Sequence, residues 1–169
     1  MIDPDAAAGG SPARQEPSAS LGATARGGLM GGRGEAGLPK VGLFACFSGG
    51  SNTGSLTGMA ALEVVKRLGG ETVGICSLPA VLNDVPRQSA IIGSIEKLVV
   101  IDGCRNSCAK ELLARKGISP DAYLNLADLR LIKKGPFSSL EFTEDEVKLV
   151  ADALASIVGK CLSQSAGLK

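Results

Sequence analysis

Short apolar runs alternate with longer segments of helical periodicity from Val41 onward. Four of these runs have the length and composition of buried strands: residues 41–47, 72–78, 98–104 and 122–129. Four other segments are predicted to be helices: residues 56–68, 87–97, 107–117 and 143–161. In the first helix, apolar residues recur at helical spacing at Met59, Leu62, Val65 and Leu68. Pro79 and Pro86 bracket a predicted loop before the second helix.

The order of these elements predicts the fold class. Strands that alternate with helices imply right-handed crossover connections and a parallel sheet. We therefore expect a three-layer α/β fold, with a mostly parallel sheet of about four strands flanked by helices, as in Rossmann-like or flavodoxin-like proteins. The last helix has its own start signal, because Thr143 and Glu146 form a capping box that satisfies the first backbone N–H groups.

Residues 1–40 differ in composition from the rest of the chain. They are rich in Ala, Gly, Ser and Pro with scattered charges, and they hold almost no large apolar residues. Such a segment cannot bury enough surface to offset the entropy lost on ordering it. We expect a disordered N-terminal arm over residues 1–40 and one α/β domain over residues 41–169. A later translation start at Met30 is a further hypothesis.

Composition excludes several classes of function. Lys and Arg number 18 against 17 Asp and Glu, and aromatic residues make up 3%, so no nucleic-acid surface is expected. The chain has no histidine, which removes histidine acid–base chemistry, Cys-His nucleophile pairs and histidine metal ligands. No apolar run is long enough to predict a membrane span or a signal peptide. We expect a cytoplasmic protein without nucleic-acid or membrane partners; its protein partner or small-molecule ligand is unknown.

The cysteines provide the main candidate site. In a reducing compartment, cysteines are more often metal ligands or redox groups than disulfides. Cys46, Cys76 and Cys104 end three predicted strands, and the carboxyl ends of parallel strands share one edge, where open α/β folds place their sites. Cys108 follows Cys104 by four residues, so a helix that began by Cys104 would put both sulfurs on one face. Cys161, late in the last helix, is expected to be a packing residue.

Four thiolates favour zinc, which binds sulfur in a closed tetrahedral site. The N-terminus of the helix at residues 107–117 would favour thiolate over thiol. Asp102 and Arg105 flank the site; Asp102 could orient a neighbouring group, and Arg105, together with Lys110, could offset the negative charge. An iron–sulfur cluster is the alternative cofactor. For a single cysteine taken alone, simple packing in the core is the alternative explanation.

A glycine-rich loop follows the first predicted strand. Its glycines permit tight turns, its polar side chains offer hydrogen-bond donors, and a loop of this kind before a helix can hold an anion. It has neither the Gly-Lys-Ser/Thr of a Walker loop nor the G-x-G-x-x-G of a dinucleotide site. A polar turn that only caps the helix is the alternative. The candidate ligand-binding residues are Ser48, Gly49, Gly50, Ser51, Asn52, Thr53 and Gly54.

Three segments, CFSGGSNTG, GICSLP and IDGCRNSCAKELL, together resemble the DGC domain family. That family is named after an Asp-Gly-Cys motif, which stands here at residues 102–104. The resemblance covers nearly all of residues 41–158 and includes the FTEDEV start of the last helix. It implies a zinc-binding domain with four chelating cysteines, and these fall on Cys46, Cys76, Cys104 and Cys108. The family supplies a metal hypothesis but no established reaction.

Three functions stay open at this point, and no catalytic residue is assigned. The first is a zinc-binding protein whose metal is structural or regulatory, since four sulfur ligands leave no position for water. The second is a thiol-redox or iron–sulfur enzyme that uses the same cysteines, with Cys46 as nucleophile and Cys104 or Cys108 as its partner, and with the glycine-rich loop binding a small anion or ligand. The third is a metal carrier or partner-binding module with one labile cysteine.

Overall fold

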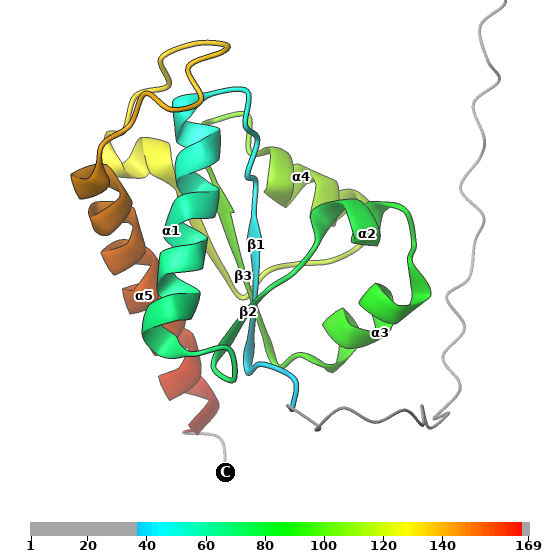
Figure 1. Cartoon of the computed structure of the whole chain (residues 1–169). Helices are drawn as coiled ribbons and strands as arrows, with labels where there is room; N and C mark the ends of the chain where they lie inside the picture. Colours follow the sequence, from blue (N-terminus) through cyan, green and yellow to red (C-terminus); the bar gives the residue numbers. More distant parts are fainter. Residues whose placement is uncertain (1–36, 167–169) are drawn as a thin grey trace, which may run out of the picture. The chain divides into compact units, whose positions relative to one another are not determined.

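The computed structural model describes residues 37–166. The predicted N-terminal arm therefore lies outside the described residues except for 37–40, and so does Met30. The elements follow the predicted alternation of strands and helices (Figure 1). The strands are β1 (Val41–Ala45), β2 (Val73–Ile75), β3 (Lys97–Asp102) and β4 (Ala122–Asn125). The helices are α1 (Asn52–Leu68), α2 (Leu78–Leu82), α3 (Pro86–Ser94), α4 (Cys108–Arg115), the 3₁₀ turn η1 (Leu126–Leu129) and α5 (Glu144–Ala166).

The four strands form one parallel sheet in the order β2-β1-β3-β4. Because β1 lies between β2 and β3, the chain leaves β1 toward one side of the sheet and later crosses back to the other side. The connections therefore diverge at the carboxyl ends of β1 and β3. In open α/β sheets this divergence, the topological switch point, creates a crevice where ligands bind.

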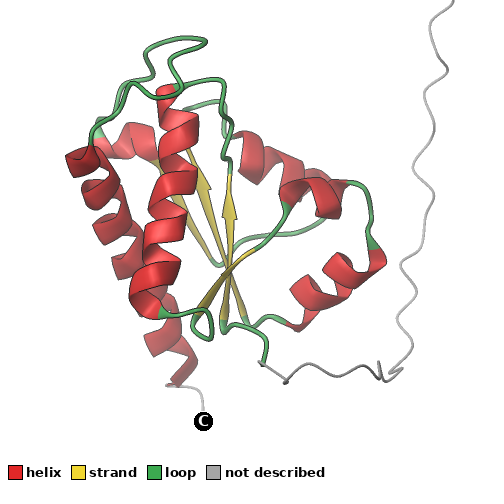
Figure 2. Ribbon diagram, in the orientation of Figure 1, coloured by secondary structure: helices red, strands yellow, loops and turns green. Residues whose placement is uncertain are grey.

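Helices cover both faces of the sheet, which gives the expected three layers (Figure 2). On one face, α1 and α5 pack against alternate strand residues that include Leu43, Val99 and Ile101. On the other face, α2, α3 and α4 pack against Phe44 and Val100. The α/β fold class predicted from the sequence is confirmed, because the strands are parallel and the central strands β1 and β3 are buried on both faces, whereas Ile75 on the edge strand β2 is 45% exposed.

The described chain departs from the predicted elements mainly near glycines and prolines. Helix α1 begins at Asn52 rather than near residue 56, and the Ser51 side chain caps it by accepting the Gly54 N–H at 3.3 Å. A short helix, α2, replaces the predicted loop after Pro79, which occupies a first-turn position where a missing N–H costs no hydrogen bond. Strand β4 ends at Asn125 and η1 takes the remainder of the predicted strand.

The face of helix α1 that packs on the core differs from the one that the spacing of its large apolar residues predicts. Met59 and Leu62 are 42% and 52% exposed, whereas the small residues Ala60 and Ala61 are fully buried. Small residues let the helix lie close to the sheet and to α5. The capping box of α5 is confirmed: the Thr143 N–H donates to Glu146 Oε2 at 2.7 Å, and the Glu146 N–H donates to Thr143 Oγ1 at 3.2 Å.

No helix between residues 37 and 166 is long and apolar enough to cross a membrane.

Candidate functional site

A small pocket opens at the switch point of the sheet. Its walls come from the loop after β1, the turn after β3 and the segment that leads to α5. Its volume is about 50 Å³, several times the minimum that one water needs but far below that of a site for a drug-sized ligand. The lining residues are Cys46, Ser48, Ser51, Thr53, Gly54, Asp102, Gly103, Cys104, Asn106, Cys108 and Lys133.

Cys46 enters the pocket from the end of β1. Its backbone N–H donates to the Ile101 carbonyl at 2.9 Å, which continues the β1–β3 ladder by one residue and holds Cys46 beside Asp102. Burial raises the pKa of the Cys46 thiol, although the backbone of Ser48 approaches the sulfur and opposes this effect. The negative charges of Asp102 and Cys108 raise the pKa further. The site therefore concentrates negative charge as its thiols ionise, and a bound cation would relieve this charge.

A turn after β3 carries the next two cysteines. The Ser107 N–H donates to the Cys104 carbonyl at 3.0 Å, and α4 begins only at Cys108. The condition that the helix has begun by Cys104 is therefore not met; a turn, not a helix, brings Cys104 and Cys108 to the same pocket. Ser107 has a left-handed backbone with φ of 49°, a strained conformation of the kind that clusters at functional sites.

Asp102 anchors this turn. Its side chain is 1% exposed, and its two carboxylate oxygens accept the N–H groups of Ala109 at 2.8 Å and Lys110 at 3.1 Å. These are two of the unpaired donors at the start of α4, where Ser107 provides no side-chain cap. Asp102 thus fixes the position of the helix that carries Cys108.

The two cations that the sequence placed beside the thiols have other partners. Arg105 pairs with Asp128 at 2.9 Å on the surface, and the Lys110 ammonium lies 4.7 Å from the centre of the Tyr123 ring. Lys133 is the cation that lines the pocket. It lies 25 residues after Cys108 in a short basic turn, and such a turn is more often a solvated loop than part of a binding site.

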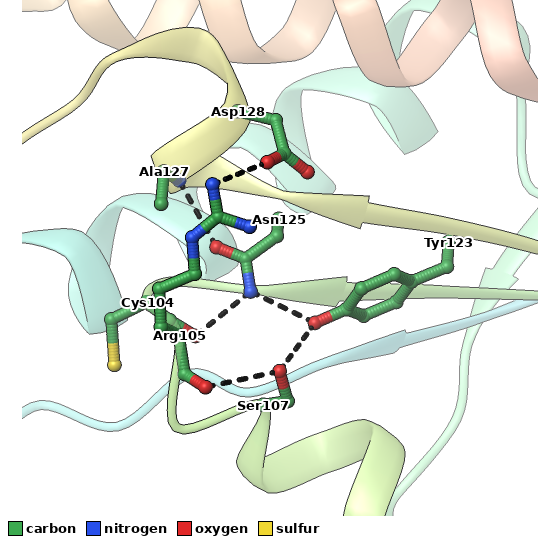
Figure 3. A network of polar contacts seen from close by, with 7 residues as sticks. All are labelled: Cys104, Arg105, Ser107, Tyr123, Asn125, Ala127 and Asp128. Atoms are coloured by element: carbon green, nitrogen blue, oxygen red, sulfur yellow. Dashed lines mark hydrogen bonds and ion pairs between the residues drawn. The ribbon is translucent and has the colours of Figure 1, made fainter.

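A network from β4 supports the turn of Cys104 from behind (Figure 3). The Asn125 amide nitrogen donates to the Cys104 carbonyl at 2.8 Å and to the Tyr123 hydroxyl at 2.9 Å, and that hydroxyl donates to Ser107 at 2.9 Å. The Cys104 sulfur points away from these bonds (Figure 3). The sequence analysis missed Asn125 and Tyr123; the available signal was a buried polar residue at the carboxyl end of a parallel strand, at the edge that carries the cysteines.

Cys76 does not line the pocket. Its N–H donates to the Leu43 carbonyl at 2.9 Å, and the strand register pairs Leu43 with Ile75, so Cys76 is level with Phe44. Along the strand direction, Cys76 therefore lies two residues before the level of Cys46. Strand β2, which it follows, pairs with the edge of β1 that faces away from β3. The Cys76 side chain packs against the core cluster of α2, α3 and α4. Burial raises the pKa of the Cys76 thiol to about 11.

Cys161 lies apart from the other cysteines. It is 4% exposed and belongs to the core cluster between α1, α5 and the sheet. This agrees with the prediction that Cys161 is a packing residue.

The fit of the site to a metal ion is partial. Three of the four predicted ligands line one pocket, and their chemistry suits zinc or another thiophilic metal. As they stand, however, no three Cys, Asp or Glu side chains within residues 37–166 are grouped so that they could hold a metal ion. Metal binding therefore requires the thiols to turn toward one another, and Cys76 would have to reach the others from outside the residues that line the pocket.

Most of the glycine-rich loop is occupied with holding the protein together. Asn52 binds the segment that leads to α5: its amide nitrogen donates to the Ile132 carbonyl at 3.0 Å, and its side-chain oxygen accepts the Lys134 N–H at 2.9 Å. The carbonyls of Gly49 and Gly50 accept the Ser139 hydroxyl and the Phe137 N–H. The segment at residues 130–142 therefore closes over the start of α1, as its orange trace shows in Figure 1.

Two glycines near the pocket have no space for a side chain. A Cβ at Gly54 would lie 2.0 Å from the Ser48 carbonyl oxygen, and one at Gly103 would lie 2.6 Å from the Thr53 carbonyl oxygen. The first turn of α1 thus packs backbone against backbone on the loop after β1 and on the turn after β3. Of the seven predicted ligand-binding residues, Ser48, Ser51, Thr53 and Gly54 line the pocket, and Ser51 is already engaged as the cap of α1.

Comparison with known proteins identifies the family. A model of the DGC domain matches residues 42–154, about two thirds of the chain and nearly all of the fold described above. No curated protein and no solved structure matches the chain. The resemblance seen in the Asp-Gly-Cys motif at residues 102–104 is therefore confirmed over the whole sheet. The chain belongs to the DGC domain family.

Proposed function

We propose that this protein binds zinc through cysteine thiolates at the carboxyl edge of its sheet. Cys46, Cys104 and Cys108 are the core ligands, and Cys76 is the fourth. One observation carries the proposal: three thiols from two distant parts of the chain line a single small pocket at the switch point. The family match by itself says nothing about how close these three thiols lie in space.

The chemistry of the pocket supports a soft divalent cation. The chain has no histidine, so zinc bound in this pocket would be held by cysteine thiolates rather than by imidazole nitrogens. The negative charges that raise the pKa of Cys46 come from Asp102 and Cys108, which are the groups that a cation would stabilise. Zinc bound by four sulfurs has no position for water, so the metal would hold the loop after β1 to the turn after β3 and give a structural or regulatory role.

Thiol-redox catalysis, the alternative function, is less well supported. The redox nucleophile must be a thiolate, and burial raises the pKa of Cys46, so at neutral pH it is held as the thiol. An iron–sulfur cluster, the other form of this alternative, would use the same sulfurs and give a brown protein. The metal analysis below would detect it as iron. The expected cytoplasmic location stays a prediction; a reducing compartment would keep these thiols available for metal.

Metal analysis of the purified full-length chain tests the proposal. We expect about one zinc per chain in the wild type and a large loss of zinc in Cys104→Ser, since removal of one ligand weakens a structural zinc site strongly. Cys161→Ala is the matched control, because it removes a cysteine from the core without touching the pocket and should keep its zinc. Metal-free wild-type protein, or full zinc in Cys104→Ser, would contradict the assignment.

Cys76 needs a separate measurement. If it moves to become the fourth ligand, Cys76→Ala lowers zinc affinity by more than tenfold in competition with a chromophoric chelator. Unchanged affinity in Cys76→Ala, together with lost affinity in Cys104→Ser, would restrict the site to the three pocket cysteines.

A further inference from the structure

Helix α1 points its N-terminus at the pocket. It has 17 residues and no acidic residue in its first turn, so no side chain of its own first turn offsets the partial positive charge of its N-terminus. The Asn52 N–H donates to the Ser138 hydroxyl at 3.1 Å, and the Gly54 N–H donates to the Ser51 side chain. Between them stands Thr53, which lines the pocket.

Thr53 carries an unsatisfied buried hydroxyl. The residue is 1% exposed. Among the buried side-chain oxygen and nitrogen atoms of residues 37–166, Thr53 Oγ1 alone has no hydrogen-bond partner. A buried hydroxyl without a partner costs about 1–3 kcal/mol. Thr53 lines the pocket, and a molecule bound there would complete the hydrogen bonding of this hydroxyl if the side chain turned toward it.

Lys133 adds a cation to the same wall. It lines the pocket, and it takes part in no ion pair among the described residues, whereas Arg105 is engaged with Asp128. The acidic residue in the pocket is Asp102, and both of its oxygens are occupied by N–H groups of α4. Lys133 is thus available to pair with a bound anion, and the two N–H groups that Asp102 accepts offset part of its negative charge.

We propose that the N-terminus of α1, the Thr53 hydroxyl and the Lys133 ammonium form a binding site for a small oxyanion of the phosphate type. The helix N-terminus and the lysine would balance its charge, and the hydroxyl would donate to one oxygen. A volume of about 50 Å³ admits a group of a few heavy atoms and excludes a nucleotide base or a flavin. None of these three groups is a predicted metal ligand, but Cys46, Cys104 and Cys108 line the same pocket, so the anion is expected to bind most tightly after the metal has been removed.

Thermal unfolding in the presence of inorganic phosphate tests this site. The unfolding midpoint of the full-length protein, as purified and again after chelation, is measured against phosphate concentration at constant ionic strength. A ligand that binds only the folded chain raises the midpoint in a saturable way. We expect saturable stabilisation by phosphate and none from an equivalent concentration of chloride. No phosphate response in either preparation, or an equal response to chloride, would overturn the proposal.

Three variants locate the response. Thr53→Val keeps the shape of the side chain and removes the hydroxyl, and Lys133→Gln removes the charge; each should weaken phosphate binding about tenfold or more, as expected for a hydrogen bond to a charged group. Lys134→Gln is the matched control, because it makes the same change one residue away, at a lysine that does not line the pocket. Equal phosphate affinity in all three variants would refute the site even if zinc binding were confirmed.

Discussion

Replacement of Asp102 by asparagine tests how the turn of Cys104 and Cys108 is held. The carboxylate of Asp102 is 1% exposed and accepts two N–H groups of α4, at 2.8 and 3.1 Å. Asp102→Asn keeps one oxygen acceptor but places an NH₂ group opposite a backbone N–H donor. The variant therefore loses one charge-assisted hydrogen bond, about 1.5–3 kcal/mol, and the attraction of a negative charge to the helix N-terminus, about 0.3–1 kcal/mol.

The expected loss in the free energy of unfolding is thus about 2–4 kcal/mol, which leaves a typical domain folded. Urea unfolding followed by circular dichroism measures it. Asp128→Asn is the control at the same sheet edge: Asp128 is 54% exposed and pairs with Arg105 at 2.9 Å, so its loss should cost less than about 1 kcal/mol. If Asp102→Asn costs no more than Asp128→Asn, within about 0.5 kcal/mol, the anchoring role of Asp102 is wrong.

Two further predictions concern packing and ionisation. Gly103→Ala should destabilise the fold by about 1–3 kcal/mol in urea, because its Cβ would lie 2.6 Å from the Thr53 carbonyl oxygen. Gly93→Ala, at a position in α3 with open space, should be neutral or stabilise by up to about 1 kcal/mol, and equal effects of the two substitutions would contradict the close backbone approach. In chelated protein, the buried thiol of Cys76 has its pKa raised from 9.0 to about 11, so the folded chain keeps this proton longer than the unfolded chain. Its contribution to stability is complete below pH 9 and falls by about 2 kcal/mol as the pH rises toward 11. Cys76→Ala should flatten this dependence in urea titrations at several pH values, and an unchanged slope would refute the raised pKa.

The sequence alone predicted the sheet and the edge at which the candidate site lies. Apolar runs such as residues 98–101 mark strands buried on both faces, and their alternation with helices allows few topologies. The pattern also placed Cys46 and Cys104 near the carboxyl ends of β1 and β3, since Cys46 follows directly on β1 and Cys104 lies two residues after β3. These predictions succeed because they depend on burial, which hydrophobic residues report directly.

The register and the hydrogen-bond partners could not be predicted. That Cys76 lies level with Phe44, below the edge, follows from where β2 pairs with β1. No local pattern encodes this pairing. The ion pair between Arg105 and Asp128 likewise depends on the position of η1, which carries Asp128. The early start of α1 at Asn52 was hidden because a run of small polar and glycine residues is typical of a loop, yet here it is buried under the segment at residues 130–142.

The way Asn125 holds the turn has a consequence for ligand capture at Cys104. Asn125 binds the backbone carbonyl and not the sulfur, so the main chain of the turn is already fixed in the folded protein. A thiol has one rotatable bond between its fixed backbone and its sulfur, and selecting one of its three staggered positions costs little entropy. For Cys104, capture of a thiophilic ligand is therefore a choice among a few side-chain orientations on a preorganised support. Its affinity is then governed by the strength of the bonds formed rather than by the cost of ordering the chain.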